Sequence, residues 1–149
     1  MTSDSEDIRF SGDYPSWVPD GTYEARCKDY SDPRPYRGTQ KVFLTFELLN
    51  EPWAGTELRM FLNVPFSGIT PGSRYFKYWT AANKDRMPSR NAKMSPHMFK
   101  DKKYRVTTKT VIPKRGSEEM PFDYHYSKVD HIELLNLPDT KDDGEAYQS

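Results

Sequence analysis

The sequence contains one cysteine, three histidines and no long apolar run, and these scarcities restrict the classes of protein it can encode. A single cysteine, Cys27, excludes a disulfide within the chain and is typical of a reducing compartment. The opening residues, MTSDSEDIRF, are acidic and lack the apolar stretch of a secretory leader, and nothing resembles a membrane-spanning helix. We therefore expect a soluble, cytoplasmic protein.

Motifs for catalysis and metal binding are also missing. The histidines and Cys27 show neither CxxC nor HExxH spacing, so no metal site is expected. The segment GITPGSR, residues 68–74, lacks the Gly-Lys-Ser/Thr ending of a phosphate loop. No serine lies in a nucleophile elbow, and the acidic residues are scattered rather than paired. The sequence predicts neither an enzyme nor a bound cofactor.

Neither sign of charge predominates, because 22 basic residues balance 22 acidic ones. The distribution along the chain is uneven. Residues 1–20 contain five acidic residues against Arg9, and residues 136–149 contain four against Lys141. The span between them is therefore basic, which is compatible either with a domain that binds a polyanion or with an ordinary solvated surface.

Two stretches, residues 41–50 and 58–64, alternate apolar and polar residues with the period of half-buried strands. Their apolar sides are formed by Val42, Leu44, Phe46 and Leu48, and by Leu58, Met60, Leu62 and Val64. Shorter alternating stretches at residues 22–30, 103–112 and 126–135 predict three more strands. The last of these is expected to contain a bulge, because its apolar positions do not keep one parity. Cys27 lies on the apolar side of the first strand and is expected in the core.

Residues 73–84 follow a helical period instead. Ser73 is a suitable N-cap, and Tyr75, Tyr78, Trp79 and Ala82 share one face that is expected to plug a barrel. The order of three strands, one helix and two strands is that of an OB-fold. The sequence therefore predicts a mainly β fold, a five-stranded OB-fold-like Greek-key barrel with one α-helix between strands three and four. A small β-sandwich with an inserted helix is the alternative.

The remaining segments are predicted to be connections and ends. Residues 86–102 are expected to form an extended basic connection, and residues 113–126 a long loop or irregular hairpin. Residues 1–17 are expected to be a flexible acidic N-terminal arm, residues 18–136 the barrel domain, and residues 137–149 an acidic disordered C-terminal tail.

Several stretches together resemble a known family. They are PDGTYEARC, KVFLTFEL, GTELRMFLNV, the aromatic helix SRYFKYWTAA, the element MFKDKKYRVTTKTV and the closing YSKVDHIELL. Across residues 18–136 the chain resembles the small OB-fold single-stranded-DNA-binding proteins of phages, plasmids and other mobile elements. The resemblance implies non-catalytic binding of single-stranded DNA through strands two and three, in replication or recombination. It also implies that an acidic tail recruits replication proteins.

The polar sides of the two long strands each carry a phenylalanine. Phe43 and Phe61 share the outward parity with Arg59 and Asn63, and Lys41 lies at the edge of this face. Unpaired nucleic acid binds to flat side chains that stack on bases and to cations that follow its backbone. We expect these five residues to form a base-stacking surface. Alternatively, the two phenylalanines pack against the helix, the arm or a second subunit of a homo-oligomer.

Two loops that flank the ligand groove of OB-folds mix aromatic and basic residues. The loop after the first strand contributes Arg34, Tyr36 and Arg37, and the loop before the last strand contributes Lys114, Arg115 and Tyr124. The fourth strand contributes Lys103, Arg105 and Lys109, which share one parity. All nine are candidate nucleic-acid contacts, although prolines and tyrosines also order long loops and a basic row is often only a solvated face. The residues do not distinguish DNA from RNA.

Two other functions fit the same pattern. A protein-interaction or structural component, such as a replisome adaptor or virion part, would use the barrel face as an oligomer or partner interface. A carbohydrate-binding module would use exposed Trp53, Tyr36 and Tyr124. Exposure of Phe43 and Phe61 in a basic groove would favour nucleic acid, whereas their burial would favour a protein interface.

Overall fold

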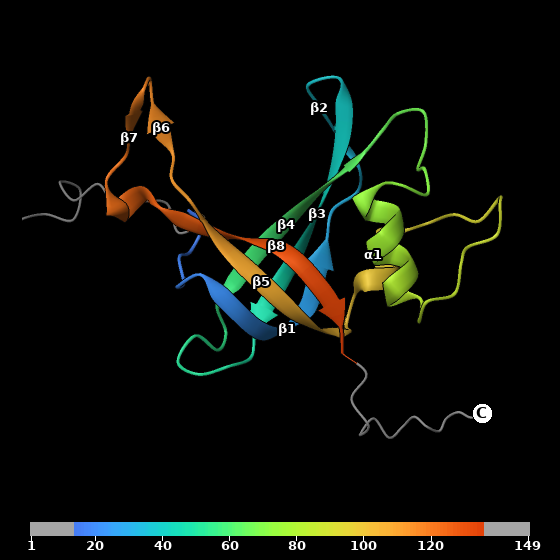
Figure 1. The fold of residues 1–149 in the computed structure, drawn as a ribbon, viewed down its shortest axis with the longest axis horizontal. Coiled ribbons are helices and arrows are strands. Elements are labelled where there is room, and N and C mark those ends of the chain that lie inside the picture. The colour runs from blue at the N-terminus through green and yellow to red at the C-terminus, as the bar shows by residue number, and fades with distance from the viewer. Residues whose placement is uncertain (1–13, 136–149) are drawn as a thin grey trace, which may run out of the picture.

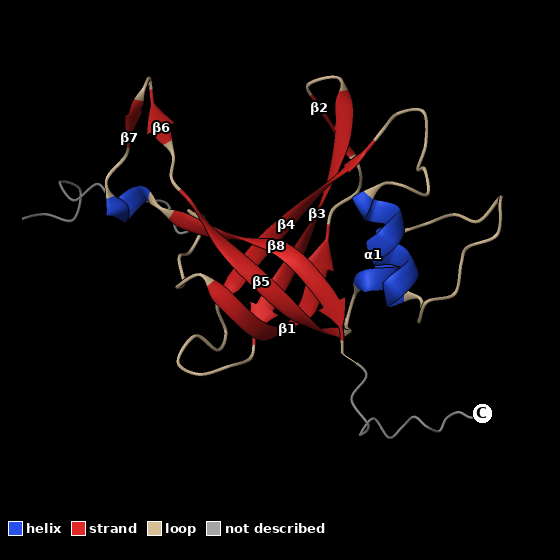
Figure 2. Cartoon of the chain, viewed as in Figure 1, coloured by secondary structure: helices blue, strands red, loops and turns tan. Residues whose placement is uncertain are grey.

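The computed structural model describes residues 14–135, which form a mainly β fold with one α-helix (Figures 1 and 2). The strands are β1 (Gly21–Tyr30), β2 (Arg34–Tyr36), β3 (Thr39–Leu48), β4 (Glu57–Val64), β5 (Lys103–Val111), β6 (Lys114–Arg115), β7 (Glu118–Glu119) and β8 (Tyr126–Leu134). The helices are α1 (Arg74–Ala82) and the short 3-10 turns η2 (Pro96–Phe99) and η3 (Phe122–Tyr124). Within this part of the chain, no helix is long and apolar enough to cross a membrane.

Five of the strands close into a barrel. Their order is β1-β5-β8-β4-β3, and β1 pairs with β3 to complete the ring. Every pairing is antiparallel except that of β4 with β8. With α1 inserted between the third and fourth barrel strands, this is an OB-fold-like barrel, as predicted. Because the strands form one closed ring, the alternative prediction of a β-sandwich was wrong.

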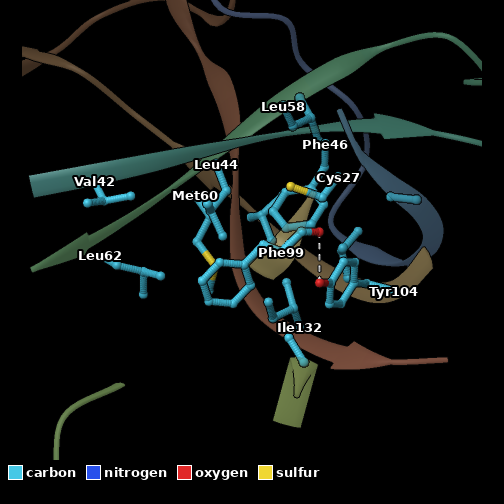
Figure 3. Close-up of a cluster of buried hydrophobic side chains, with 14 of the residues drawn as sticks. Cys27, Val42, Leu44, Phe46, Leu58, Met60, Leu62, Phe99, Tyr104 and Ile132 are labelled. Atoms are coloured by element: carbon cyan, nitrogen blue, oxygen red, sulfur yellow. Dashed lines mark hydrogen bonds between the residues drawn. The ribbon is translucent and has the colours of Figure 1, made fainter. Parts of the chain in front are cut away.

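The core follows the predicted alternation of apolar and polar residues. From Val42 onward every second residue of β3 is buried, as is every second residue of β4. The ladder places Val42 opposite Leu62, Leu44 opposite Met60 and Phe46 opposite Leu58, and Leu48 and Val64 extend the two buried rows. Cys27 is buried beside them, as expected (Figure 3). The core is completed by edge-on aromatic contacts, with ring centroids 5.5 Å apart for Phe46 and Tyr104 and 5.8 Å apart for Tyr75 and Phe99. Such contacts stabilise a core beyond the burial of apolar area alone.

Helix α1 begins where its N-cap predicts. The hydroxyl of Ser73 accepts a hydrogen bond from the backbone N–H of Phe76 at 3.1 Å, which satisfies one free donor of the first turn. Tyr75, Trp79 and Ala82 are buried, whereas Tyr78 is only half-buried. The polar tips of the two buried aromatic residues are also satisfied, because Tyr75 Oη donates to the Met94 carbonyl and Trp79 Nε1 to the Ser95 carbonyl. The helix therefore packs over the barrel as a plug.

The connection of residues 86–102 is not extended throughout. Ser95 caps the 3-10 turn η2, which delivers the fully buried Phe99 to the core. The Tyr104 hydroxyl donates to the Phe99 carbonyl at 2.9 Å, shown as a dashed line in Figure 3. The prediction of an extended connection was therefore wrong at residues 96–99.

The predictions for the last strands are confirmed. The register of β8 against β5 shifts between Thr107 and Thr108, which are paired with His131 and Val129, so Asp130 is the extra residue of a bulge. The bulge keeps both Val129 and Ile132 in the core. The preceding segment, residues 113–126, is an irregular hairpin built from β6, β7 and η3.

The segment before β1 contacts the barrel from residue 14 onward. The Ser127 hydroxyl is buried and bonded to both backbone groups of Val18, accepting from its N–H at 2.8 Å and donating to its carbonyl at 2.9 Å. Trp17 Nε1 donates to Thr110 Oγ1 at 3.0 Å. Residues 14–17, assigned to the arm by the sequence, thus pack against β5 and β8. The rest of the predicted arm and the predicted tail at 137–149 lie outside the described residues.

We expect Ser127→Ala to destabilise the fold by about 1–3 kcal/mol, because it leaves the buried N–H and carbonyl of Val18 without their partner. Urea unfolding followed by circular dichroism measures this change. Ser117→Ala, which alters an exposed serine between β6 and β7, is the control and should leave the midpoint unchanged. Equal stability of the two variants would show that the Ser127 hydrogen bonds contribute nothing net.

Candidate nucleic-acid interface

Phe43 and Phe61 face each other across β3 and β4 on the outside of the barrel. They form a directly opposite pair in the antiparallel ladder, with ring centroids 5.9 Å apart and planes at 62°. Phe61 has 44% of its surface exposed, and Phe43 is half-buried. The side that packs the core is filled by their neighbours Val42, Leu44 and Leu62, so neither phenylalanine belongs to the core. This is the outward aromatic pair that the sequence predicted.

A third aromatic ring joins the pair through the hairpin of β2 and β3. Tyr36 is paired with Thr39, and the two residues between them, Arg37 and Gly38, both have positive φ, at 48° and 80°. Two consecutive left-handed residues define the tight hairpin turn that matches the twist of its strands. The turn folds β2 back on β3 and places exposed Tyr36 beside the face of β3 and β4. We call Tyr36, Phe43 and Phe61 the stacking platform.

Four cations lie over the rings of the stacking platform. The Arg59 guanidinium is 4.6 Å from the Phe43 centroid, and that of Arg34 is 5.7 Å from the same ring. The Lys41 ammonium is 4.6 Å from the Tyr36 centroid and 5.8 Å from that of Phe61. The Arg37 guanidinium is 5.3 Å from the Tyr36 ring. The structure thus brings together the predicted residues of the first loop and of strands two and three.

Asn63 completes this predicted group. It is exposed and directly opposite Lys41, on the same outward side of β4 as Phe61 and Arg59. Its side-chain amide contains both hydrogen-bond donors and an acceptor, so it can form hydrogen bonds with a ligand at the edge of the platform.

A cleft of about 810 Å³ continues from the platform across the barrel surface. Arg59 and Phe61 line it from β4, and Tyr126 and Lys128 line it from β8. Sequence reasoning assigned no binding role to Lys128, because only the parallel pairing of β4 with β8 places it directly opposite Arg59. A parallel contact between strands so distant in the chain leaves no local pattern that could have revealed it.

The three basic residues of β5 separate into two groups. Lys109 is directly opposite Lys128, so it is the neighbour of a residue that lines the cleft. Lys103 is opposite Arg26 at the other end of the strand, and Arg105 lies near Glu133, 3.5 Å away in an exposed ion pair. Since β5 pairs with β1 and β8 but not with β3 or β4, Lys103 and Arg105 do not join the stacking platform.

The second predicted loop stands apart from the first. The hairpin of β6 and β7 rises from one side of the barrel and that of β2 and β3 from the other (Figure 1). Lys114 is paired with Glu119 and Arg115 with Glu118, so acidic residues accompany both of its cations. Tyr124 lies in η3, where its carbonyl accepts a hydrogen bond from the Tyr14 hydroxyl at 2.7 Å. The second loop is therefore separate from the hairpin that carries Tyr36.

The side chains that could bind a metal ion or act as a nucleophile are dispersed, hydrogen-bonded or buried within residues 14–135. Residues 14–135 contain no cluster of three His, Cys, Asp or Glu side chains that could hold a metal ion. His131 Nδ1 is 2.9 Å from the Tyr78 hydroxyl, and His125 Nε2 is 3.0 Å from the Met120 carbonyl. Burial raises the pKa of the Cys27 thiol to about 12, which removes the thiolate on which cysteine reactivity depends.

Comparison with known proteins gives no family assignment: no family model matches the chain, and no curated protein matches it. The fold and the exposed aromatic and basic face are therefore the basis for a functional proposal.

We expect Cys27 to resist a thiol-specific reagent at pH 8 while the chain is folded, because its pKa lies near 12 and its side chain is buried. The thiol should react fully once urea unfolds the chain. Absorbance of the released chromophore measures both rates. Rapid labelling of the folded chain would contradict the burial of this residue.

Proposed function

We propose that this protein binds single-stranded DNA without catalysis, with bases stacked on Tyr36, Phe43 and Phe61. The observation that carries the proposal is the concentration of three aromatic rings and four cations on one exposed face. Flat rings for bases and cations for phosphates are the two requirements of single-strand binding. The fold supports the proposal as well, because OB-fold barrels often bind oligonucleotides on the face formed by this pair of strands.

The cations over the rings do not block this use. A cation over an exposed ring contributes about 0.5–1 kcal/mol, whereas a base stacked on an aromatic side chain contributes about 1–3 kcal/mol. Replacing Arg59 or Lys41 on its ring by a base is therefore favourable on balance. The displaced cation becomes available for a phosphate. Arg59 and Lys41 thus cover the rings in the free protein and contact the phosphates of the nucleic acid in the complex.

The geometry of the rings supports binding of unpaired bases. The exposed rings lie on the surface of a barrel rather than on a helix or ribbon that would enter a duplex groove. Only unpaired bases can turn their flat faces toward such rings. We therefore propose that the protein prefers single strands to duplex.

The wider role is proposed from the resemblance. It is that of a cytoplasmic replication or recombination accessory of a phage or mobile element, with residues 137–149 as the segment that recruits replication proteins. Those residues lie outside the described part of the chain. The competing use of the same face, as an interface for a protein partner or a second copy, predicts no affinity for oligonucleotides.

The deciding experiment is fluorescence anisotropy of a labelled thirty-base oligo(dT) with the full chain, at low and moderate salt, beside a matched duplex. We expect binding that prefers the single strand and weakens with salt. Each phosphate neutralised should contribute about −0.7 to the slope of log affinity against log salt. No binding at low salt would overturn the proposal and favour the protein interface.

We expect Phe43→Ala combined with Phe61→Ala to weaken binding of oligo(dT) at least about 30-fold, because two stacking contacts of about 1 kcal/mol or more are lost. Both rings lie outside the core, so the variant should fold. Anisotropy titration measures the affinity, and circular dichroism confirms the fold.

The matched control replaces two large apolar side chains away from the barrel strands, Phe76→Ala with Met87→Ala. Phe76 is half-buried on α1, and Met87 is 68% exposed in the loop that follows it. This control should bind like the wild type. Unchanged affinity of a folded Phe43 and Phe61 double variant would remove the stacking platform from the binding site.

A further inference from the structure

Three cations form one row across three adjacent strands. Arg59 on β4 is directly opposite Lys128 on β8, and Lys128 is directly opposite Lys109 on β5. All three side chains are exposed, so they project from the same outer surface of the barrel. Neighbouring strands are about 4.8 Å apart, so the row extends over about 10 Å. We call these three residues the basic row.

The basic row has no anion of its own within residues 14–135. The ion pairs of this part of the chain join Lys28 to Glu57 and Arg105 to Glu133, and neither includes a member of the row. Like charges directly opposite each other in a sheet destabilise it. The pairing of Lys128 with both Lys109 and Arg59 is therefore unfavourable in the free protein. A bound anion would relieve that repulsion.

The surroundings of the row fit an extended anion better than a single one. Arg59 and Lys128 line the cleft of about 810 Å³ together with Phe61. Phe61 lies two residues beyond Arg59 on the same strand and the same side, about 7 Å away. In the opposite direction, two residues before Arg59, Glu57 lies directly opposite Glu47 and also lines the cleft, where its carboxylate is joined to Lys28 in an exposed ion pair. The cations thus lie between the aromatic pair and an acidic border.

We propose that the basic row is a track for the phosphodiester backbone, which carries the single strand from the stacking platform over β4, β8 and β5. Bases stack on the Phe43 and Phe61 side, and successive phosphates contact Arg59, Lys128 and Lys109. Lys128 is thereby assigned as a binding residue. This inference rests on the proposed function and adds the direction in which the strand leaves the platform.

The test is the salt dependence of oligo(dT) binding by Lys109→Gln combined with Lys128→Gln. Two lost phosphate contacts should make the slope of log affinity against log salt less negative by about 1.4. Affinity at low salt should fall as well. Anisotropy titrations of the full chain at four salt concentrations give the slope, and thermal unfolding confirms that the variant folds.

The matched control is Lys103→Gln combined with Arg105→Gln. It removes the same two charges from the other end of β5, where the residues are paired with β1 and β8 away from the cleft. Its slope should equal that of the wild type. An equal change in both variants would show an effect of net charge alone and would overturn the track.

The two proposals can fail separately. Binding by the wild type with an unchanged slope in the Lys109 and Lys128 variant would overturn the track and leave the stacking platform in place. Loss of affinity in the Phe43 and Phe61 variant, without a change of slope, would support both proposals, because the stacking platform would then contact bases while the basic row contacts phosphates. Absence of binding by the wild type would overturn both proposals.

Discussion

The fold depends on β1, which forms hydrogen bonds along both of its edges. Its first half pairs with β5, from Gly21 to Arg26, and its second half pairs with β3, from Ala25 to Tyr30. A strand that changes partner along its length closes the five barrel strands into a ring, and only the short β2 remains as an edge strand beside β3. Closure curls β3 and β4 so that one side fills the interior and the other side is presented to solvent. The candidate interface is this outer side.

Alternation of residue types allowed the barrel strands to be predicted, because burial on one face enforces a period of two. The same alternation predicts that Phe43 and Phe61 lie on the outer surface, where the structure has them. Contacts that depend on long-range pairing could not be found in this way. Lys128 joins Arg59 only through the parallel pairing of β4 with β8. Phe99 enters the core from a 3-10 turn whose surrounding sequence has no periodicity.

The outer face combines rings and cations that contact one another in the free protein. Arg59 and Lys41 cover rings that would otherwise expose more apolar surface. Exposed apolar surface favours nonspecific association. The cations thus limit that association while keeping the face ready for an anionic ligand. The acidic pair of Glu47 and Glu57 sets a border on one side of this face.

The hairpin of β6 and β7 consists of two-residue strands that pair only with each other, in a sheet separate from the barrel. Its side chains are exposed, and none belongs to the hydrophobic core. Insertions in such surface elements are tolerated because they disturb few contacts. The hairpin can therefore be lengthened, shortened or exchanged in the course of evolution without refolding the barrel.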